Sequence, residues 1–182
     1  AAIDFLRRKY RQMPIVGMEP AVKPACLNTR SGVVGVLATA RSLDGDLFRR
    51  TAARYGENIR VLTAVGEGFV ELVEEDREQS PEAEEAVRRV LEPMIREGAD
   101  QIVLGCTHYP FLKKELRHFL GDRDIHLIDG SLGTSRELMR RLKVQGLLRT
   151  DDHKGKVRIM NSSGRQELID LSLKLLNLPD YE

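Results

Sequence analysis

Short apolar segments alternate along this chain with longer segments in which apolar residues recur at helical spacing. Short apolar runs bounded by turn residues are typical of strands buried on both faces of a sheet. Strands that alternate with helices predict an α/β protein, with a mostly parallel sheet covered by helices on both faces. The predicted strands are Pro14–Gly17, Val33–Ala38, Ile59–Val65, Gln101–Leu104, Ile125–Ile128 and Val157–Met160.

The boundaries of one predicted helix are marked clearly. Ser80 suits the N-cap, Pro81 the first helical position, and Gly98 the end of the helix. A second predicted helix contains Pro24 and is therefore expected to be short or broken. The predicted helices are Ile3–Tyr10, Pro20–Leu27, Asp44–Tyr55 closed by Gly56, Phe69–Glu74, Ser80–Gly98, Pro110–Leu120, Thr134–Leu142 and Gln166–Leu176.

Charged side chains are numerous but nearly balanced. They make up 31% of the 182 residues and leave a net charge of +1. This balance gives no support to a nucleic-acid or polybasic membrane function, and no apolar run is long enough to span a bilayer. The two cysteines lack the spacing of a disulfide framework, which fits a reducing compartment. We therefore expect a cytoplasmic protein that binds neither nucleic acid nor a membrane.

The segment Gly105-Cys106-Thr107-His108-Tyr109-Pro110 carries the candidate chemistry. It follows an apolar strand and precedes an amphipathic stretch, so the pattern predicts a turn between a strand and a helix. Such a turn holds a thiol, a hydroxyl and an imidazole at the carboxyl end of a strand, where open α/β sheets bind ligands. A helix N-terminus favours anions and lowers the pKa of a thiol. The alternative is a buried, inert cysteine.

This hexapeptide closely resembles the second cysteine motif of the cofactor-independent glutamate racemases. The resemblance continues in order through Pro14–Ala25, Gly35–Thr39, Phe69–Glu74 and Leu127–Gly130. It implies an Asp/Glu racemase-like fold of two α/β domains, with the active site in the cleft between them. Residues 31–130 then correspond to a complete second domain, and residues 1–30 and 131–182 to remnants of a discontinuous first domain. We expect the chain to be a fragment, because the family's Asp-Ser-Gly turn and first Cys-Asn-Thr motif have no counterpart in it.

The resemblance also implies roles for four residues. Cys106 would be one of two bases that exchange the Cα proton of glutamate, without a cofactor, to supply D-glutamate for peptidoglycan. His108 would orient Cys106 or handle its proton, and Thr107 would contact a polar group of the substrate. Glu74 matches a glutamate that lies near the second cysteine in the family; the alternative is that it is simply one acid of the exposed run Glu74-Glu75-Asp76.

The other cysteine, Cys26, is expected to be a packed residue. Ala25-Cys26-Leu27-Asn28-Thr29 looks like a Cys-Asn-Thr motif, but the inserted leucine breaks the spacing that would direct both side chains at one ligand. With one usable cysteine, the chain alone is predicted not to racemise glutamate. The sequence departs from the family at Val65-Gly66, where many members have Cys-Pro, and at Ser42, where a threonine is common. Both departures concern the lining of the cleft.

Several alternatives stay open at this point. No metal site is expected, because Cys106, His108, His118, His126 and His153 lack the spacing of a structural zinc site. The loop Gly130–Ser135 lacks the P-loop pattern and suits a plain helix start. The activity could be that of an aspartate or other amino-acid racemase of the same superfamily, or the chain could be a non-catalytic α/β binding module. Exposed apolar surface on an incomplete domain further predicts a homodimer or an unstable protein.

Overall fold

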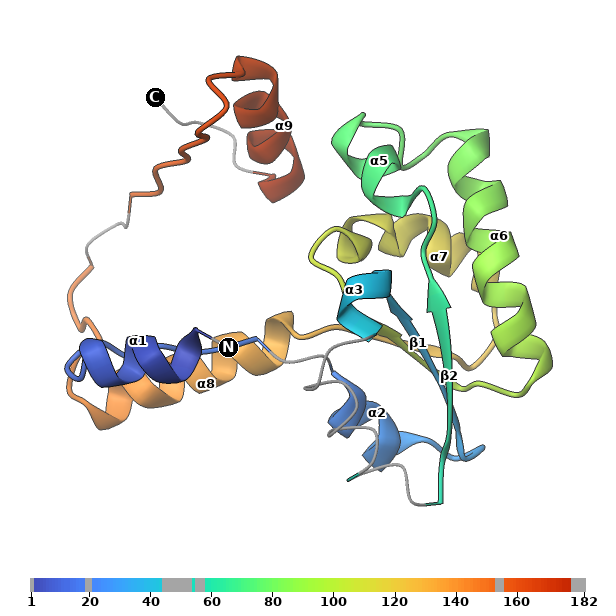
Figure 1. The fold of residues 1–182 in the computed structure, drawn as a ribbon, viewed down its shortest axis with the longest axis horizontal. Helices are drawn as coiled ribbons and strands as arrows, with labels where there is room; N and C mark the ends of the chain where they lie inside the picture. Colours follow the sequence, from blue (N-terminus) through green and yellow to red (C-terminus); the bar gives the residue numbers. More distant parts are fainter. Residues whose placement is uncertain (1, 19–20, 44–53, 55–57, 153–155, 178–182) are drawn as a thin grey trace.

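The computed structural model describes residues 2–18, 21–43, 54, 58–152 and 156–177. Four strands in this part of the chain form one sheet, with helices on both sides (Figure 1). The strands are β1 (Val33–Ala38), β2 (Arg60–Val65), β3 (Gln101–Leu104) and β4 (His126–Ile128). The helices are α1 (Ile3–Lys9), α2 (Val22–Asn28), α3 (Ala40–Leu43), α5 (Phe69–Glu74), α6 (Pro81–Arg96), the 3₁₀ helix η1 (Tyr109–Leu112), α7 (Lys113–Leu120), α8 (Ser131–Val144) and α9 (Gln166–Leu176).

The sheet is parallel throughout and has the strand order β2-β1-β3-β4. Its two faces bury alternate residues of the same strands, as the two-residue period of a strand requires. Leu37, Ile102 and Leu104 pack in the larger core cluster, under α5, α6 and α7. Val34, Val36 and Val103 pack in the smaller cluster, under α2. The predicted α/β architecture is confirmed, and the sheet is covered on both faces (Figure 1).

Helix α6 shows how local sequence sets the boundaries of an element. The Ser80 side chain accepts a hydrogen bond from the Ala83 N–H (3.3 Å), and Pro81 occupies the first turn. Gly98 adopts a φ of 86° just beyond the last turn, a conformation that favours glycine. The buried stripe is that of an amphipathic helix: Ala83, Ala86, Val87, Val90, Leu91 and Met94. Both predicted boundaries of this helix are confirmed within two residues.

Asp100 fastens the turn before β1 to the start of β3. Its carboxylate accepts hydrogen bonds from the Thr29 hydroxyl (2.6 Å) and from the backbone N–H groups of Arg30 (2.6 Å) and Ser31 (3.0 Å). Partial burial alone would raise the pKa of Asp100, but these hydrogen bonds outweigh it and hold the pKa below its usual value. The ionised carboxylate therefore stabilises the junction between α2, β1 and β3.

Two of the predicted strands are wrong. Residues 14–17 and 157–160 belong to no helix or strand and lie outside the sheet. An apolar run becomes a strand only where a neighbouring strand supplies backbone hydrogen-bond partners. The second predicted helix begins at Val22 rather than Pro20, so Pro24 lies in its first turn, where its missing N–H costs no hydrogen bond. The helix predicted at Asp44–Tyr55 lies outside the described residues, except for Arg54.

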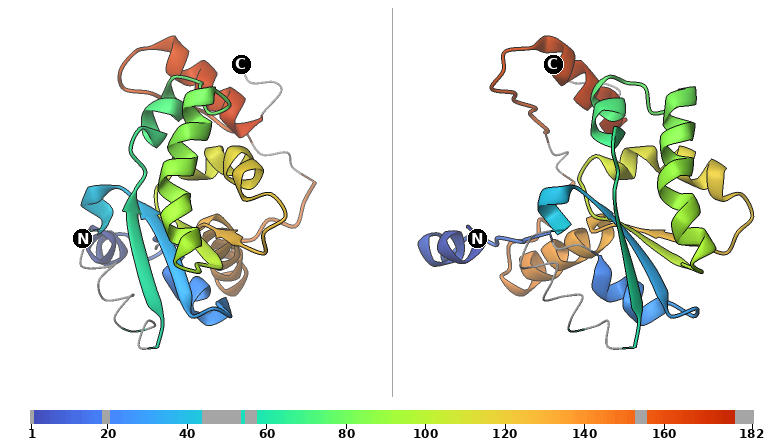
Figure 2. Two further views of the ribbon diagram at one scale, coloured as in Figure 1. Left: turned by 90° about the vertical axis from the view of Figure 1, so that its right-hand side faces the viewer. Right: turned by 45° about the vertical axis from the view of Figure 1, so that its right-hand side comes forward.

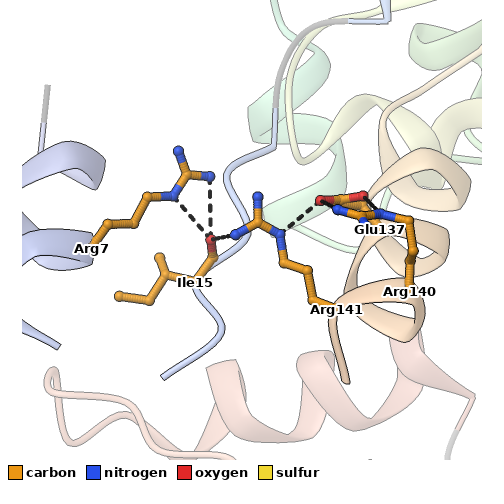
Figure 3. Close-up of polar contacts among 5 residues, drawn as sticks. All are labelled: Arg7, Ile15, Glu137, Arg140 and Arg141. Atoms are coloured by element: carbon orange, nitrogen blue, oxygen red, sulfur yellow. Dashed lines mark hydrogen bonds and ion pairs between the residues drawn. The ribbon is translucent and has the colours of Figure 1, made fainter. Parts of the chain in front are cut away.

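Helices α1 and α8 lie to one side of the sheet in Figure 1, and Figure 2 shows that they are apart from each other. The Ile15 carbonyl connects them, because it accepts hydrogen bonds from Arg7 Nε and Nη2 (3.3 Å each) and from Arg141 Nη1 (3.5 Å) (Figure 3). Glu137 pairs with both Arg140 and Arg141, and hydrogen bonds from these two guanidinium groups lower its pKa to about 2. In the segment 14–17, for which strand pairing is predicted, the Ile15 carbonyl thus accepts hydrogen bonds from side chains.

The last helix, α9, lies beside α5 (Figures 1 and 2). Lys174 forms an ion pair with Asp76, and Leu175 packs against the larger core cluster. None of the helices in the described part of the chain combines the length and the hydrophobicity that a membrane span requires.

Candidate active site

The cysteine turn leaves the carboxyl end of β3, the second of the two inner strands. Gly105 continues the pairing with β1 through a hydrogen bond from its N–H to the Leu37 carbonyl (2.7 Å). A Cβ atom at Gly105 would lie 3.0 Å from that carbonyl oxygen and 3.1 Å from the Ala38 Cβ. The glycine therefore lets the turn pass close to β1. Cys106 follows half-buried at the rim of the sheet, where an open parallel sheet places its ligands.

His108 connects the thiol to a carboxylate. Its Nδ1 lies 3.9 Å from Cys106 Sγ, and its Nε2 lies 3.1 Å from Glu74 Oε1. A carboxylate can only accept, so we assign the proton to Nε2, which leaves Nδ1 as an acceptor on the side of Cys106. The structure thus brings together three of the predicted site residues, from β3–η1 and from α5. We refer to Cys106, His108 and Glu74 as the relay.

Thr107, the fourth predicted site residue, is exposed at the tip of the turn. Its Oγ1 lies 3.3 Å from Nδ1 of His108, so its hydroxyl can donate to the same lone pair that the thiol would use. Only one of the two protons can be accepted at a time. The Thr107 hydroxyl and the Cys106 thiol therefore compete for the same acceptor, Nδ1 of His108.

Glu74 differs from its acidic neighbours because its partner is His108. Glu75 pairs with Arg77 and Asp76 pairs with Lys174, so each acid in the run meets a different cation or imidazole. Asp76 has a φ of 58°, so the chain leaves the helical conformation directly after Glu75. The side chain of Glu74 remains 55% exposed, so water competes with His108 for it.

A 3₁₀ turn rather than an α-helix follows the cysteine turn. His108 caps η1, Pro110 lies in its first turn, and α7 begins only at Lys113. The 3₁₀ turn runs directly into α7, so the predicted helix start has a tighter first turn. Among the described residues, His108 lies within hydrogen-bond distance of the Cys106 thiol.

Tyr109 is a buried residue of the motif to which sequence reasoning gave no role. Its ring meets Phe69 edge to face, with centroids 5.1 Å apart, and its hydroxyl contacts the backbone of Gly66. Burial raises the pKa of Tyr109 to about 12, and the nearby Cys106 charge acts in the same direction. The partners lie about forty residues apart in the chain, and no local sequence pattern links residues so distant.

Cys26 lies away from the relay, as a packed residue of α2. It is 5% exposed and belongs to the smaller core cluster, with Val34 and Val103. Burial raises the pKa of its thiol, which keeps it protonated and unreactive. The packing expected for Cys26 is thus what the structure shows.

The other candidate sites gain no support. No group of three potential metal ligands occurs among the described residues, which do not include His153. The loop after β4 begins α8 at Ser131, whose N–H donates to Asp129 (2.7 Å). Asp129 also forms an ion pair with Lys113, so a carboxylate of the chain already occupies the start of this helix.

Comparison with known proteins gives a consistent result. Residues 1–132 match the family model described as Asp/Glu/Hydantoin racemase. The chain is 41% identical over 176 residues to a glutamate racemase of Clostridium botulinum, with 97% of the chain and 68% of the relative covered. It is 47% identical over 150 residues to a glutamate racemase of Ectopseudomonas mendocina, with 82% and 57% covered.

Solved structures show the same likeness in three dimensions. The structure of Escherichia coli glutamate racemase with L-glutamate and the activator UDP-MurNAc-ala matches with a TM-score of 0.73 at 27% identity, over 95% of this chain and 65% of that one. A Francisella tularensis glutamate racemase in complex with D-glutamate matches with a TM-score of 0.76 at 23% identity, over 96% and 64%. The chain thus spans between 57% and 68% of the length of these relatives.

Proposed function

Because the chain belongs to the Asp/Glu/hydantoin racemase family, we propose that it provides one half of the proton-transfer chemistry of a glutamate racemase, without a cofactor. The relay carries this proposal: a thiol, an imidazole and a carboxylate follow one another at 3.9 and 3.1 Å at the carboxyl rim of the sheet. Two observations favour glutamate. Relatives at 41% and 47% identity are glutamate racemases, and the E. coli structure contains L-glutamate.

The proposed reaction begins with activation of the thiol. Cys106 gives its proton to Nδ1 of His108, and the resulting imidazolium is stabilised by Glu74 through Nε2–H. The thiolate then takes the Cα proton of glutamate: the C–H bond breaks, an S–H bond forms, and the electron pair remains on the substrate next to its carboxylate. Return of a proton from the same thiol restores the same enantiomer. Inversion needs a second acid on the opposite face of the planar intermediate.

Thr107 would couple substrate binding to this step. We propose that its hydroxyl or backbone N–H contacts a polar group of glutamate. A hydroxyl engaged with substrate no longer donates to His108 Nδ1, which then becomes available to the Cys106 thiol. Substrate would thereby favour the thiolate at the moment it is needed.

Protonation from the opposite face needs a second thiol, and the chain has no second cysteine that is accessible to substrate. Its only other cysteine is Cys26, which is buried in the smaller core cluster. We therefore propose that the 182-residue chain exchanges the Cα proton of one glutamate enantiomer but does not racemise it. The homodimer predicted from sequence stays a prediction.

Proton NMR in D₂O tests the proposal. L-glutamate, D-glutamate and the two aspartates are incubated separately with the wild-type chain, with Cys106→Ser and with Cys26→Ser. We expect the Cα–H signal of one glutamate enantiomer to disappear with the wild type and with Cys26→Ser, but not with Cys106→Ser, and we expect no inversion.

The other outcomes assign other functions. Exchange with aspartate alone would identify a different racemase of the family. Binding of glutamate without exchange would identify a non-catalytic module, and exchange that survives Cys106→Ser would remove Cys106 as the base. Rapid inversion by the wild-type chain would overturn the single-base proposal.

A further inference from the structure

We propose that Tyr109 is a positioning residue for the relay: its hydroxyl ties the Cys106 turn to the backbone of Gly66 and thereby holds His108 and Glu74 within hydrogen-bond distance. This inference rests on the proposed function, because it assumes that the relay controls Cys106. It adds a residue that does not touch the reacting atoms and acts only through His108 and Glu74.

The contact is buried and involves both backbone polar groups of one residue, the N–H and the carbonyl of Gly66. The Gly66 N–H donates to Tyr109 Oη (3.2 Å), and the Tyr109 hydroxyl donates to the Gly66 carbonyl (3.4 Å). The same carbonyl accepts a hydrogen bond from the Phe69 N–H (3.2 Å), which begins α5. One phenol hydroxyl thus fixes the turn between β2 and the helix that carries Glu74.

The Tyr109–Gly66 contact adjoins both segments that carry His108 and Glu74. Tyr109 directly follows His108, and α5 extends from Phe69, near Gly66, to Glu74. The two segments therefore meet twice, once at the buried Tyr109–Gly66 contact and once at the His108–Glu74 hydrogen bond. The second contact joins side chains that are 32% and 55% exposed. Exposed pairs contribute little to fixing their own geometry, so the buried contact must hold the two segments in register.

The fit around Gly66 is close enough that a side chain there would break the contact. A Cβ atom at this position would lie 2.7 Å from Phe69 Cδ2 and 2.8 Å from both Cζ and Oη of Tyr109. The distances are shorter than real Cβ contacts, so one of the two rings would have to move. Gly66→Ala therefore disrupts the contact at Gly66, whereas Tyr109→Phe disrupts it at Tyr109.

The chemistry of the hydroxyl fits positioning rather than proton transfer. A pKa of about 12 keeps Tyr109 neutral across the physiological range, so the hydroxyl remains both a donor and an acceptor. A neutral phenol can satisfy the N–H and the carbonyl of Gly66 together, whereas a phenolate could only accept. Phenylalanine at this position would keep the ring against Phe69 but leave the buried Gly66 N–H without its partner.

The test measures the rate at which iodoacetamide alkylates Cys106 as a function of pH, with the labelled peptide identified by mass spectrometry. Variants are Tyr109→Phe, Gly66→Ala, Glu74→Ala and the double variant Tyr109→Phe/Glu74→Ala. Val87→Ala, a buried α6 residue of the same core cluster, is the control for lost stability alone. A merely structural tyrosine would lower the melting temperature without moving the pH profile.

We expect Tyr109→Phe and Gly66→Ala to move the profile to higher pH, as Glu74→Ala does, and to lower the rate at pH 7 by about two- to fivefold. The double variant should match Glu74→Ala, because both changes act through one contact. A shift with Glu74→Ala but none with Tyr109→Phe would overturn the positioning role alone. No shift with any of the four variants, Glu74→Ala included, would overturn it together with the relay. A shift of the same size with Val87→Ala would overturn the positioning role, because lost stability alone would then explain the effect. Failure of glutamate exchange with the shifts intact would overturn only the proposed function.

Discussion

Replacing Glu74 by glutamine isolates the contribution of one charge to the relay. The variant keeps the size of the side chain and an oxygen that can accept from Nε2 of His108, so the tautomer with Nδ1 free is preserved. What is lost is the attraction between the carboxylate and the imidazolium that forms when Cys106 gives up its proton. The change therefore affects the thiolate-imidazolium state and leaves the neutral state nearly as it was.

The magnitude follows from the distance and the exposure of the pair. At the observed Nε2–Oε1 separation of 3.1 Å, Coulomb's law in a water-like dielectric gives about 1.3 kcal/mol. The pair is also screened by salt and loses side-chain entropy, and exposed pairs typically contribute about 0.2–1 kcal/mol. A loss of about 0.5–1 kcal/mol corresponds to a two- to fivefold smaller population of the thiolate, since about 1.4 kcal/mol is tenfold.

The assay is alkylation of Cys106 by iodoacetamide at pH 7 under pseudo-first-order conditions. The burial of Cys26 makes the reaction report on a single thiol. Glu75→Gln is a closely matched control, because the adjacent glutamate pairs with Arg77 and makes no hydrogen bond to His108 among the described residues. We expect a two- to fivefold lower rate for Glu74→Gln and an unchanged rate for Glu75→Gln.

Two results would refute this reasoning. Equal rates for the wild type and Glu74→Gln would show that the hydrogen bond between His108 and Glu74 does not stabilise the thiolate. Equal losses in the two variants would show that the effect comes from the net charge of the acidic run rather than from a specific pair. Raising the ionic strength should shrink the difference between the wild type and Glu74→Gln, because the pair is open to solvent.

Three further predictions concern the frame around the site. Gly105→Ala should lower the free energy of unfolding by about 1–3 kcal/mol in urea denaturation, because its Cβ would press on the Leu37 carbonyl; an unchanged midpoint would contradict this. The depressed pKa of Asp100 contributes stability that is present above its unfolded pKa of about 3.9 and lost as pH falls through the folded value. The urea midpoint should thus fall below about pH 4 in the wild type, and Asp100→Asn should lower it at neutral pH and flatten this dependence. Cys26→Ser should destabilise the fold by about 1–2 kcal/mol, because it buries a hydroxyl, yet leave the alkylation rate of Cys106 within a factor of about two; a larger change would show that α2 acts on the site.

The features that the sequence predicts correctly are those with local signals. The boundaries of α6 follow from Ser80, Pro81 and Gly98, each of which acts within one helical turn of its own position. The position of the cysteine turn likewise follows from a strand that ends in a short motif, because the direction of a parallel strand decides where the following residues lie. The apolar runs at 14–17 and 157–160 show the limit of such signals. Their patterns match strands, but hydrogen bonding to a neighbouring strand depends on the rest of the fold.

Contacts between distant segments account for what the sequence does not reveal. Among three consecutive acids, it is Glu74 that meets His108, because the fold places α5 against η1. The partnership of Tyr109 with Gly66 depends on the packing of Phe69 between two segments that are far apart in the chain. Both contacts arise from tertiary packing, which produces no periodic pattern in the sequence of either segment.

The strand order has a consequence for how the protein is made. Strand β1 pairs with β2 on one side, but its other neighbour is β3, and Val34 there meets Gln101. A ribosome that adds about 5–20 residues per second needs roughly 4 to 14 seconds to synthesise the roughly 70 residues between these two partners. During that interval an uncharged apolar strand, Val33–Ala38, has one edge open to any other nascent chain. Brief protection by a chaperone on the ribosome would therefore benefit this segment.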